Sequence, residues 1–220
     1  MQILGVIPAR GGSKGIPRKN LAVVGDKPLL AWTIEAARAS RLLTRFVVST
    51  ESGEVAAAAR RLGAEVLERP AELARDETPM LEVVVHALAA VGSCDVLVLL
   101  QPTSPLRRGE HIDEAVSLLF ETGADSVVSV VEVPHRFRPD SLMVLENGRL
   151  APLGAAAPRR QDKRPVYARN GPAVLVLRAS RLGDDLYGGD CRPYLMDAND
   201  SVDVDDAFDL QLAEFLLSRR

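Results

Sequence analysis

Residues Ile3 to Leu21 read ILGVIPARGGSKGIPRKNL. The apolar run Ile3–Ile7 has the length of a β-strand, and it leads directly into a glycine-rich, basic loop. Glycines let backbone N–H groups come close to an anion, and Lys and Arg side chains neutralise its charge. No acidic residue occurs before Asp26. The stretch predicts a nucleoside triphosphate site at the end of the first strand, built from Arg10, Gly11, Gly12, Lys14, Gly15, Arg18 and Lys19.

The chain beyond this loop alternates short apolar runs with helical periodicity. Apolar strands that alternate with amphipathic helices indicate a mostly parallel sheet covered on both faces, which is the doubly wound α/β class. We expect one domain over residues 1–220. The predicted strands are Ile3–Ile7, Arg45–Ser49, Ala64–Leu67, Asp95–Leu100 and Ser126–Val131, and the predicted helices are Pro28–Ser40, Glu54–Leu62 and Glu110–Phe120.

The alternation stops after Val131, and residues about 134–168 form a predicted sub-lobe. Asn147-Gly148 between two apolar segments is typical of a β-hairpin. This hairpin and the basic tract after it could cover a site or contact another subunit, and the sequence does not choose between these roles. A strand near Ala173–Leu177 and a helix over Asp206–Leu217 follow, with Phe208, Leu212 and Phe215 on one face of that helix.

Composition excludes several classes of protein. The chain has 220 residues and a formal net charge of -3, which argues against general nucleic-acid binding. Two cysteines are too few for a disulfide framework. No apolar run is long enough for a membrane span, and the N-terminus lacks the pattern of a signal peptide. We therefore expect a cytoplasmic protein that does not bind a membrane.

The loop matches neither the Walker pattern nor the G-x-G-x-x-G dinucleotide pattern, and the alternative interpretation is an ordinary basic surface loop. A second cluster, Gln101 to Arg107, follows the predicted strand that ends at Leu100. Carboxyl ends of parallel strands face one crevice, so Gln101 could bind a sugar or base and Arg107 could bind an anion. The alternative here is a proline-stiffened turn before a helix.

A third cluster is Ser201-Val202-Asp203-Val204-Asp205. Alternation in an extended segment places both carboxylates on one face, about 7 Å apart at their Cα atoms. Two such oxygen ligands suit Mg²⁺, which also binds substrate phosphates and waters. The alternative is that Asp205 or Asp206 caps the last helix. In the basic tract, Arg159 and Arg160 could hold a carboxylate substrate, or they could be ordinary surface residues.

In their order along the chain, these motifs resemble those of CMP-sialic acid synthetases, the acylneuraminate cytidylyltransferases. The matching segments are A-R-G-G-S-K-G-I-P-x-K-N-L, L-Q-P-T-S-P-L-R, R-R-Q-D, the Asn170-Gly171 pair and S-V-D-V-D, which together extend from Ile3 to about Glu214. The resemblance implies a nucleotide-diphospho-sugar transferase fold, a hairpin and flap that mediate homodimerisation, and Mg²⁺ as cofactor. It implies that CTP and a nonulosonic acid give a CMP-sugar and pyrophosphate.

The resemblance also implies roles for individual residues. Arg10 and Lys19 would hold the triphosphate, with Gly12, Ser13 and Lys14 in the same loop, and Asn20, Arg69 and Thr78 would complete the nucleotide site. Gln101 and Arg160 would bind the sugar, Arg160 through its carboxylate. Asp203 and Asp205 would bind the metal, and either could take the proton of the attacking hydroxyl. The expected catalytic residues are Arg10, Lys19, Arg160 and Asp205.

One departure from the family pattern concerns the sugar. Pro172-Ala173-Val174 follows Asn170-Gly171 where relatives often carry Ala-Ile-Tyr, so N-acetylneuraminate, legionaminate, pseudaminate and the deaminated sugar all stay candidates. Two other functions stay open as alternatives. One is a CMP-Kdo synthetase or another sugar nucleotidyltransferase, and the other is a non-catalytic nucleotide-binding module.

Overall fold

A computed structural model of the chain describes residues 1–153, 165–183 and 185–220. Its centre is a mixed sheet with strand order β10-β7-β11-β6-β1-β4-β5, and β12 pairs with β7 outside this path. Strands β5, β4, β1 and β6 are parallel, whereas β11 runs antiparallel to both β6 and β7. The strands of this sheet are β1 (Ile3–Pro8), β4 (Arg45–Thr50), β5 (Glu65–Glu68), β6 (Val96–Leu99), β7 (Ser126–Glu132), β10 (Tyr167–Arg169), β11 (Leu175–Arg178) and β12 (Cys191–Leu195).

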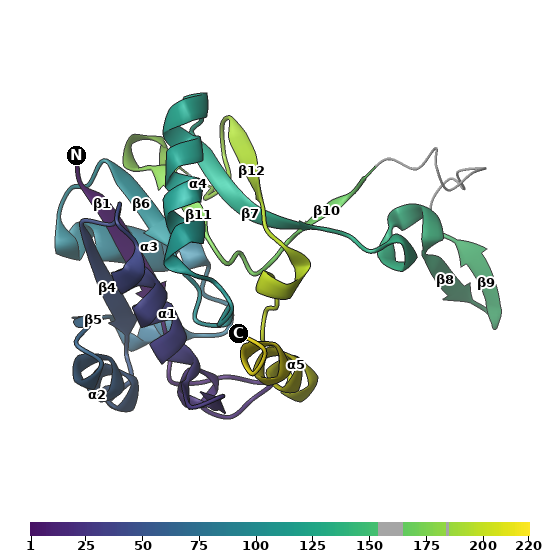
Figure 1. Ribbon diagram of the computed structural model, residues 1–220, viewed down its shortest axis with the longest axis horizontal. Coiled ribbons are helices and arrows are strands. Elements are labelled where there is room, and N and C mark those ends of the chain that lie inside the picture. The colour runs from purple at the N-terminus through teal and green to yellow at the C-terminus, as the bar shows by residue number, and fades with distance from the viewer. Residues whose placement is uncertain (154–164, 184) are drawn as a thin grey trace.

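Helices cover both faces of the sheet, as Figure 1 shows. Alternate strand residues such as Ile7 and Val98 face α1, α2 and α4, whereas Val6 and Leu99 face α3 on the other side. This two-sided burial explains the near-continuous apolar strands and confirms the predicted doubly wound α/β class. The helices are α1 (Leu29–Ala39), α2 (Gly53–Arg61), α3 (Met80–Val91), α4 (Gly109–Thr122) and α5 (Ala207–Leu217).

Most of the predicted elements are present, with small shifts at their ends. Pro28 precedes α1 as its N-cap and is not its first helical residue. Gly63 and Gly123 follow α2 and α4 with positive φ angles of 72° and 69°, as expected for the residue after a helix. None of the helices within the described ranges has the length and apolar character that a bilayer crossing requires.

Several elements were not predicted, and the last helix packs differently from the prediction. Helix α3 and the edge strands β10 and β12 were missed. In α5, Phe208 and Phe215 are exposed, and the helix packs instead through Ala213, Leu210 and Leu217 against Val24 and Leu106.

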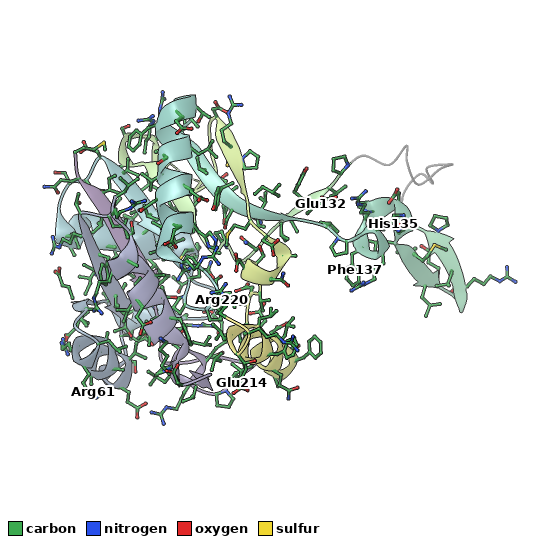
Figure 2. The ribbon with its side chains drawn as sticks, viewed as in Figure 1. Arg61, Glu132, His135, Phe137, Glu214 and Arg220 are labelled. Carbon is green, nitrogen blue, oxygen red and sulfur yellow. The ribbon has the colours of Figure 1, made fainter. Side chains whose placement is uncertain are left out.

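The predicted hairpin is present and lies apart from the main sheet. Among the described residues, strands β8 (Met143–Glu146) and β9 (Arg149–Pro152) pair only with each other, and the Asn147-Gly148 turn joins them. Figures 1 and 2 show the arm, which carries His135 and Phe137 near its base and projects away from the helices. A second small ladder, β2 (Val23–Val24) with β3 (Lys27–Pro28), follows the basic loop.

Candidate nucleotide site

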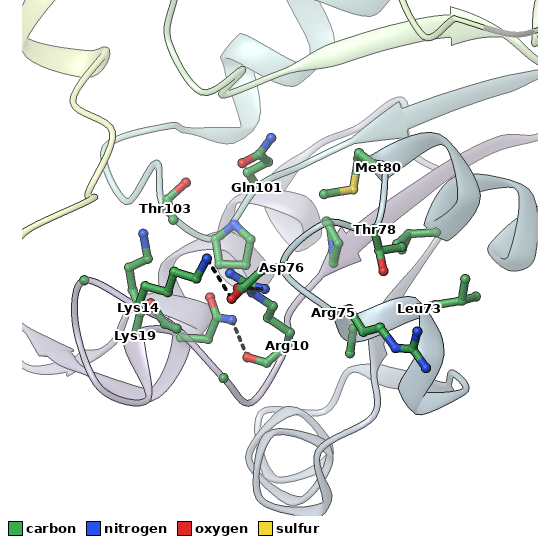
Figure 3. Close-up of a pocket in the computed structure, with 18 of the residues that line it drawn as sticks. Arg10, Lys14, Lys19, Leu73, Arg75, Asp76, Thr78, Met80, Gln101 and Thr103 are labelled. Atoms are coloured by element: carbon green, nitrogen blue, oxygen red, sulfur yellow. Dashed lines mark hydrogen bonds and ion pairs between the residues drawn. The ribbon is translucent and has the colours of Figure 1, made fainter.

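A pocket of about 410 Å³ lies at the carboxyl ends of the parallel strands. Four segments line it: the loop after β1, the segment between β5 and α3, the turn after β6, and the segment before α5 (Figure 3). Most of the residues predicted from the sequence lie on its wall. Gly11, Arg18 and Arg107 do not line it, and Arg159 and Arg160 fall outside the described residues. The predicted residues on the wall are Arg10, Gly12, Ser13, Lys14, Lys19, Asn20, Arg69, Thr78, Gln101, Asp203 and Asp205.

The basic loop is held in place by contacts with its own backbone and with the segment before α5. The buried Asn20 side chain donates from Nδ2 to the carbonyl oxygen of Arg10 at 2.8 Å. Lys19 Nζ donates to the Val204 carbonyl oxygen and to Asp205 Oδ1, both at 2.9 Å. Lys19 therefore lies between the loop and the predicted metal ligands.

A carboxylate that sequence reasoning missed lies against the cations of this loop. Asp76 Oδ1 is 2.6 Å from Arg10 Nη1, and Asp76 Oδ2 is 3.0 Å from Lys14 Nζ (Figure 3). Lys14 and Arg10 hold the pKa of Asp76 below its usual value, so it is ionised at neutral pH. Asp76 thus contacts the same two cations that a phosphate group would need.

The end of the pocket near α3 is more apolar. Leu73, Met80 and Val83 line it, together with the buried guanidinium of Arg69. Met80 packs against the core and is only partly buried because it also borders this pocket. An apolar wall with one buried cation suits a flat, polar-edged ring such as a nucleobase.

Gln101 and Arg107 follow β6, but only Gln101 lines the pocket. Gln101 Nε2 donates to the Gly171 carbonyl oxygen at 3.0 Å. The idea that Arg107 binds an anion is wrong: its guanidinium is buried and donates to the carbonyl oxygens of Gln101 and Ala173 and to Thr33 Oγ1. Burial lowers the pKa of Arg107 to about 9, so it remains charged at neutral pH.

The alternation in Val202 to Asp205 is present. Val204 is fully buried, whereas Asp203 and Asp205 both line the pocket. The capping alternative applies to Asp206, whose side chain accepts from the N–H groups of Phe208 and Asp209, and this leaves Asp205 available to the pocket.

The carboxylate pair fits a magnesium ion that shares its coordination with a substrate. Asp203 Oδ1 is buried and has no hydrogen-bond partner among the described residues, as expected for an oxygen that awaits a ligand. Burial raises the pKa of Asp203 above its usual value. No cluster of three or more His, Cys, Asp or Glu suited to a metal occurs in the described ranges, so the remaining ligands would be phosphates and waters.

Comparisons with known proteins identify the family to which this chain is similar. The family model for cytidylyltransferases matches residues 4–175. The chain is 35% identical over 216 residues to the N-acylneuraminate cytidylyltransferase of Escherichia coli O18:K1:H7, covering 96% of this chain and 51% of that protein. It is also 35% identical over 228 residues to the CMP-N,N'-diacetyllegionaminic acid synthase of Legionella pneumophila, covering 99% of this chain and 97% of that protein.

Solved structures with low sequence identity share the fold. A CMP:2-keto-3-deoxy-manno-octonic acid synthetase complexed with CTP superposes with a TM-score of 0.77 at 16% identity, covering 100% of this chain and 99% of that one. The chain spans about half the length of the first curated relatives it matches, at 51%, 50% and 49%. The match to the family model and the identity to these relatives lead to one assignment: the chain belongs to the cytidylyltransferase family.

Proposed function

We propose that the protein transfers CMP from CTP to a nonulosonic acid and releases pyrophosphate. The observation that carries this proposal is the pocket itself, which joins the cations of the first loop, Gln101 and the Asp203/Asp205 pair on one wall. The names of the Escherichia coli and Legionella pneumophila relatives point to N-acylneuraminate and N,N'-diacetyllegionaminate as acceptors.

The chemistry requires positioning and charge stabilisation more than covalent participation of the protein. The sugar hydroxyl attacks the α-phosphorus in line, a new P–O bond forms, and the bond to pyrophosphate breaks. Arg10, Lys14 and Lys19 stabilise the negative charge on the phosphates, and Gln101 orients the sugar acid. Asp203 and Asp205 would hold Mg²⁺, which supplies further neutralisation when bound, and Asp205 is exposed enough to accept the hydroxyl proton.

Pyrophosphate release tests the proposal directly. Each of the four NTPs is combined with a panel of N-acetylneuraminate, legionaminate, pseudaminate, the deaminated sugar and Kdo. We expect release only with CTP and at least one nonulosonic acid. Release with Kdo alone would favour the CMP-Kdo synthetase alternative, and nucleotide binding without release under any condition would favour a non-catalytic module.

The magnesium site can be tested by stability as well as turnover. Asp203→Asn removes a desolvated carboxylate and its repulsion by Asp205. In a solution kept free of metal by a chelator, we expect the variant to be more stable than the wild type by about 1 kcal/mol, or roughly 2–4 °C in Tm. We also expect it to lose turnover and the rise in Tm that Mg²⁺ with CTP produces. A variant with native metal-dependent turnover would show that Asp203 is not a ligand.

We further propose a cytoplasmic homodimer, with Arg160 binding the sugar carboxylate. The unpaired thiols of Cys94 and Cys191 are consistent with a reducing compartment. The dimer is supported by the exposed apolar side chains of the β8–β9 arm, whose two strands pair only with each other within the described residues. Arg160→Ala should raise the KM for the sugar acid while leaving the affinity for CTP unchanged.

A further inference from the structure

Glu51 contacts two parts of the nucleotide pocket at once. It follows β4, and its Oε1 accepts from the Gly11 backbone N–H at 2.7 Å. Its Oε2 accepts from Arg69 Nη2 at 3.1 Å. The Glu51 side chain is 17% exposed and that of Arg69 only 3%. One carboxylate therefore connects the basic loop to the cation at the apolar end.

The contact with Gly11 fixes the start of the loop. The Gly11 N–H is occupied by Glu51, so it is not among the backbone groups offered to a phosphate. A Cβ at Gly11 would lie 2.7 Å from Ser52 Cβ, which shows how tightly the loop packs on the turn after β4. The phosphate-binding part of the loop thus begins at Gly12, on a base held by Glu51.

The contact with Arg69 keeps a buried cation in place. Burial lowers the pKa of Arg69, Glu51 opposes this effect, and the nearby charge of Arg10 adds to it. Without Glu51, Arg69 would lose its ion pair with that carboxylate and keep the unfavourable effect of the nearby Arg10 charge. Arg69 lines the pocket, and its buried Nε has no hydrogen-bond partner in the described part of the chain.

We propose that Glu51 is a positioning residue that sets the phosphate loop and Arg69 at a fixed separation, so that one nucleotide engages both. It lines no part of the pocket itself and acts through Gly11 and Arg69. This inference rests on the proposed function for the identity of the nucleotide.

The test uses ligands that probe each end of the pocket separately. Inorganic tripolyphosphate probes the loop, cytidine probes the Arg69 end, and CTP probes both. Glu51→Gln leaves one acceptor oxygen for two donors, so it cannot hold Gly11 and Arg69 together. The control is Glu68→Gln. Glu68 directly precedes Arg69, and its exposed carboxylate pairs with Arg60 instead.

We expect Glu51→Gln to weaken the binding of both tripolyphosphate and cytidine, as measured by calorimetry. The Kd for CTP should rise by roughly tenfold or more, the size of one charge-assisted hydrogen bond. In turnover, the KM for CTP should rise while kcat at saturating CTP and the KM for the sugar acid stay near wild type. Glu68→Gln should change none of these quantities. Weakening of only one of the two probes would show that Glu51 supports one end alone and would overturn the proposal.

A second variant covers the case in which Glu51→Gln does not fold. Glu51→Asp keeps the charge but is one methylene too short to reach both partners, so we expect the same loss of both probes to a smaller extent. Native binding of both probes by either folded variant would refute the inference. A wild-type protein that binds both probes but forms no CMP-sugar would instead refute the proposed function, because the binding comparison does not depend on turnover.

Discussion

Gly15 is the residue at which the phosphate loop and the predicted metal ligands meet. A Cβ at this position would lie 2.4 Å from the backbone oxygen of Asp205, and a backbone atom cannot move aside as a side chain can. We expect Gly15→Ala to lower the free energy of unfolding by about 1–3 kcal/mol, the usual cost of overpacking. It should also raise the KM for CTP, because the loop and the Asp205 segment are forced apart. Urea denaturation and steady-state kinetics measure both effects.

Gly12→Ala is the matched control, because a Cβ there meets no atom within 4 Å. We expect its free energy of unfolding to equal that of the wild type. Equal stability of the two variants would contradict the close approach at Gly15. The sequence predicted a glycine-rich anion loop, but it did not reveal which glycine is required by packing, since that depends on a residue 190 positions away in the chain.

The segment between β5 and α3 carries an acid that would compete with a bound nucleotide. Asp76 contacts both Arg10 and Lys14, so under the proposed function CTP has to displace it before its phosphates reach these cations. We expect Asp76→Asn to lower the KM for CTP by about two- to fivefold, since exposed ion pairs are individually weak. Glu77→Gln, which removes the adjacent exposed charge, is the control. A raised KM would instead show that Asp76 holds Arg10 in its working position.

The start of α4 has a histidine whose burial predicts a pH dependence of stability. Burial lowers the pKa of His111, and the charge of Arg108 adds to this effect. The unfolded chain therefore binds a proton at higher pH than the folded protein, and stability falls as the pH drops below about 6.5. The other titratable groups that face this ring are Glu114, Tyr194, Asp200 and Arg220.

His111→Gln tests this dependence. His111 Nδ1 accepts a hydrogen bond from the backbone N–H of Arg108 at 3.2 Å, and a Gln side chain can accept the same hydrogen bond. We expect the variant to lose less stability than the wild type between about pH 7 and pH 5, as measured by urea denaturation at each pH. If the free energy of unfolding changes with pH in the same way for both proteins, then His111 has the same pKa in the folded and unfolded states.

The elements that the sequence predicted are those whose pattern is local. Strands β1 and β6 are buried on both faces, so their apolar runs are nearly continuous. Helix α3 was missed because Val83, Val84 and Val85 interrupt the helical pattern with β-branched residues, and its helical form depends on packing against the sheet. Strand β12 contains Pro193 and mostly half-exposed side chains, so only its pairing with β7 identifies it.

At the scale of the whole molecule, the chain topology explains which parts of the site were predictable. Parallel strands end at one edge, so residues directly after β1 and β6 could be expected to meet, and Arg10 and Gln101 do line one pocket. Asp76 and Glu51 belong to no motif, and single acidic residues in loops give no signal in a sequence. Their contacts with Arg10, Gly11 and Arg69 exist only because the folded sheet brings these loops together.

The projecting arm makes the strongest prediction about assembly. Leu145 and Leu150 face each other across the β8–β9 ladder and are 73% and 66% exposed, next to the exposed Met143. An isolated two-stranded hairpin is only marginally stable in water, so this apolar face needs a covering surface, which we propose is a second copy of the chain.

Leu145→Glu with Leu150→Glu should convert the dimer to a monomer in light scattering, because the two acids would repel each other and resist burial. Glu146→Gln, on the opposite face of the hairpin, should leave the dimer intact. A wild-type monomer, or a doubly substituted protein that remains dimeric, would show that the arm has another role. If the arm also completes the neighbouring site through Arg160, the monomeric variant should bind CTP normally and lose affinity for the sugar acid.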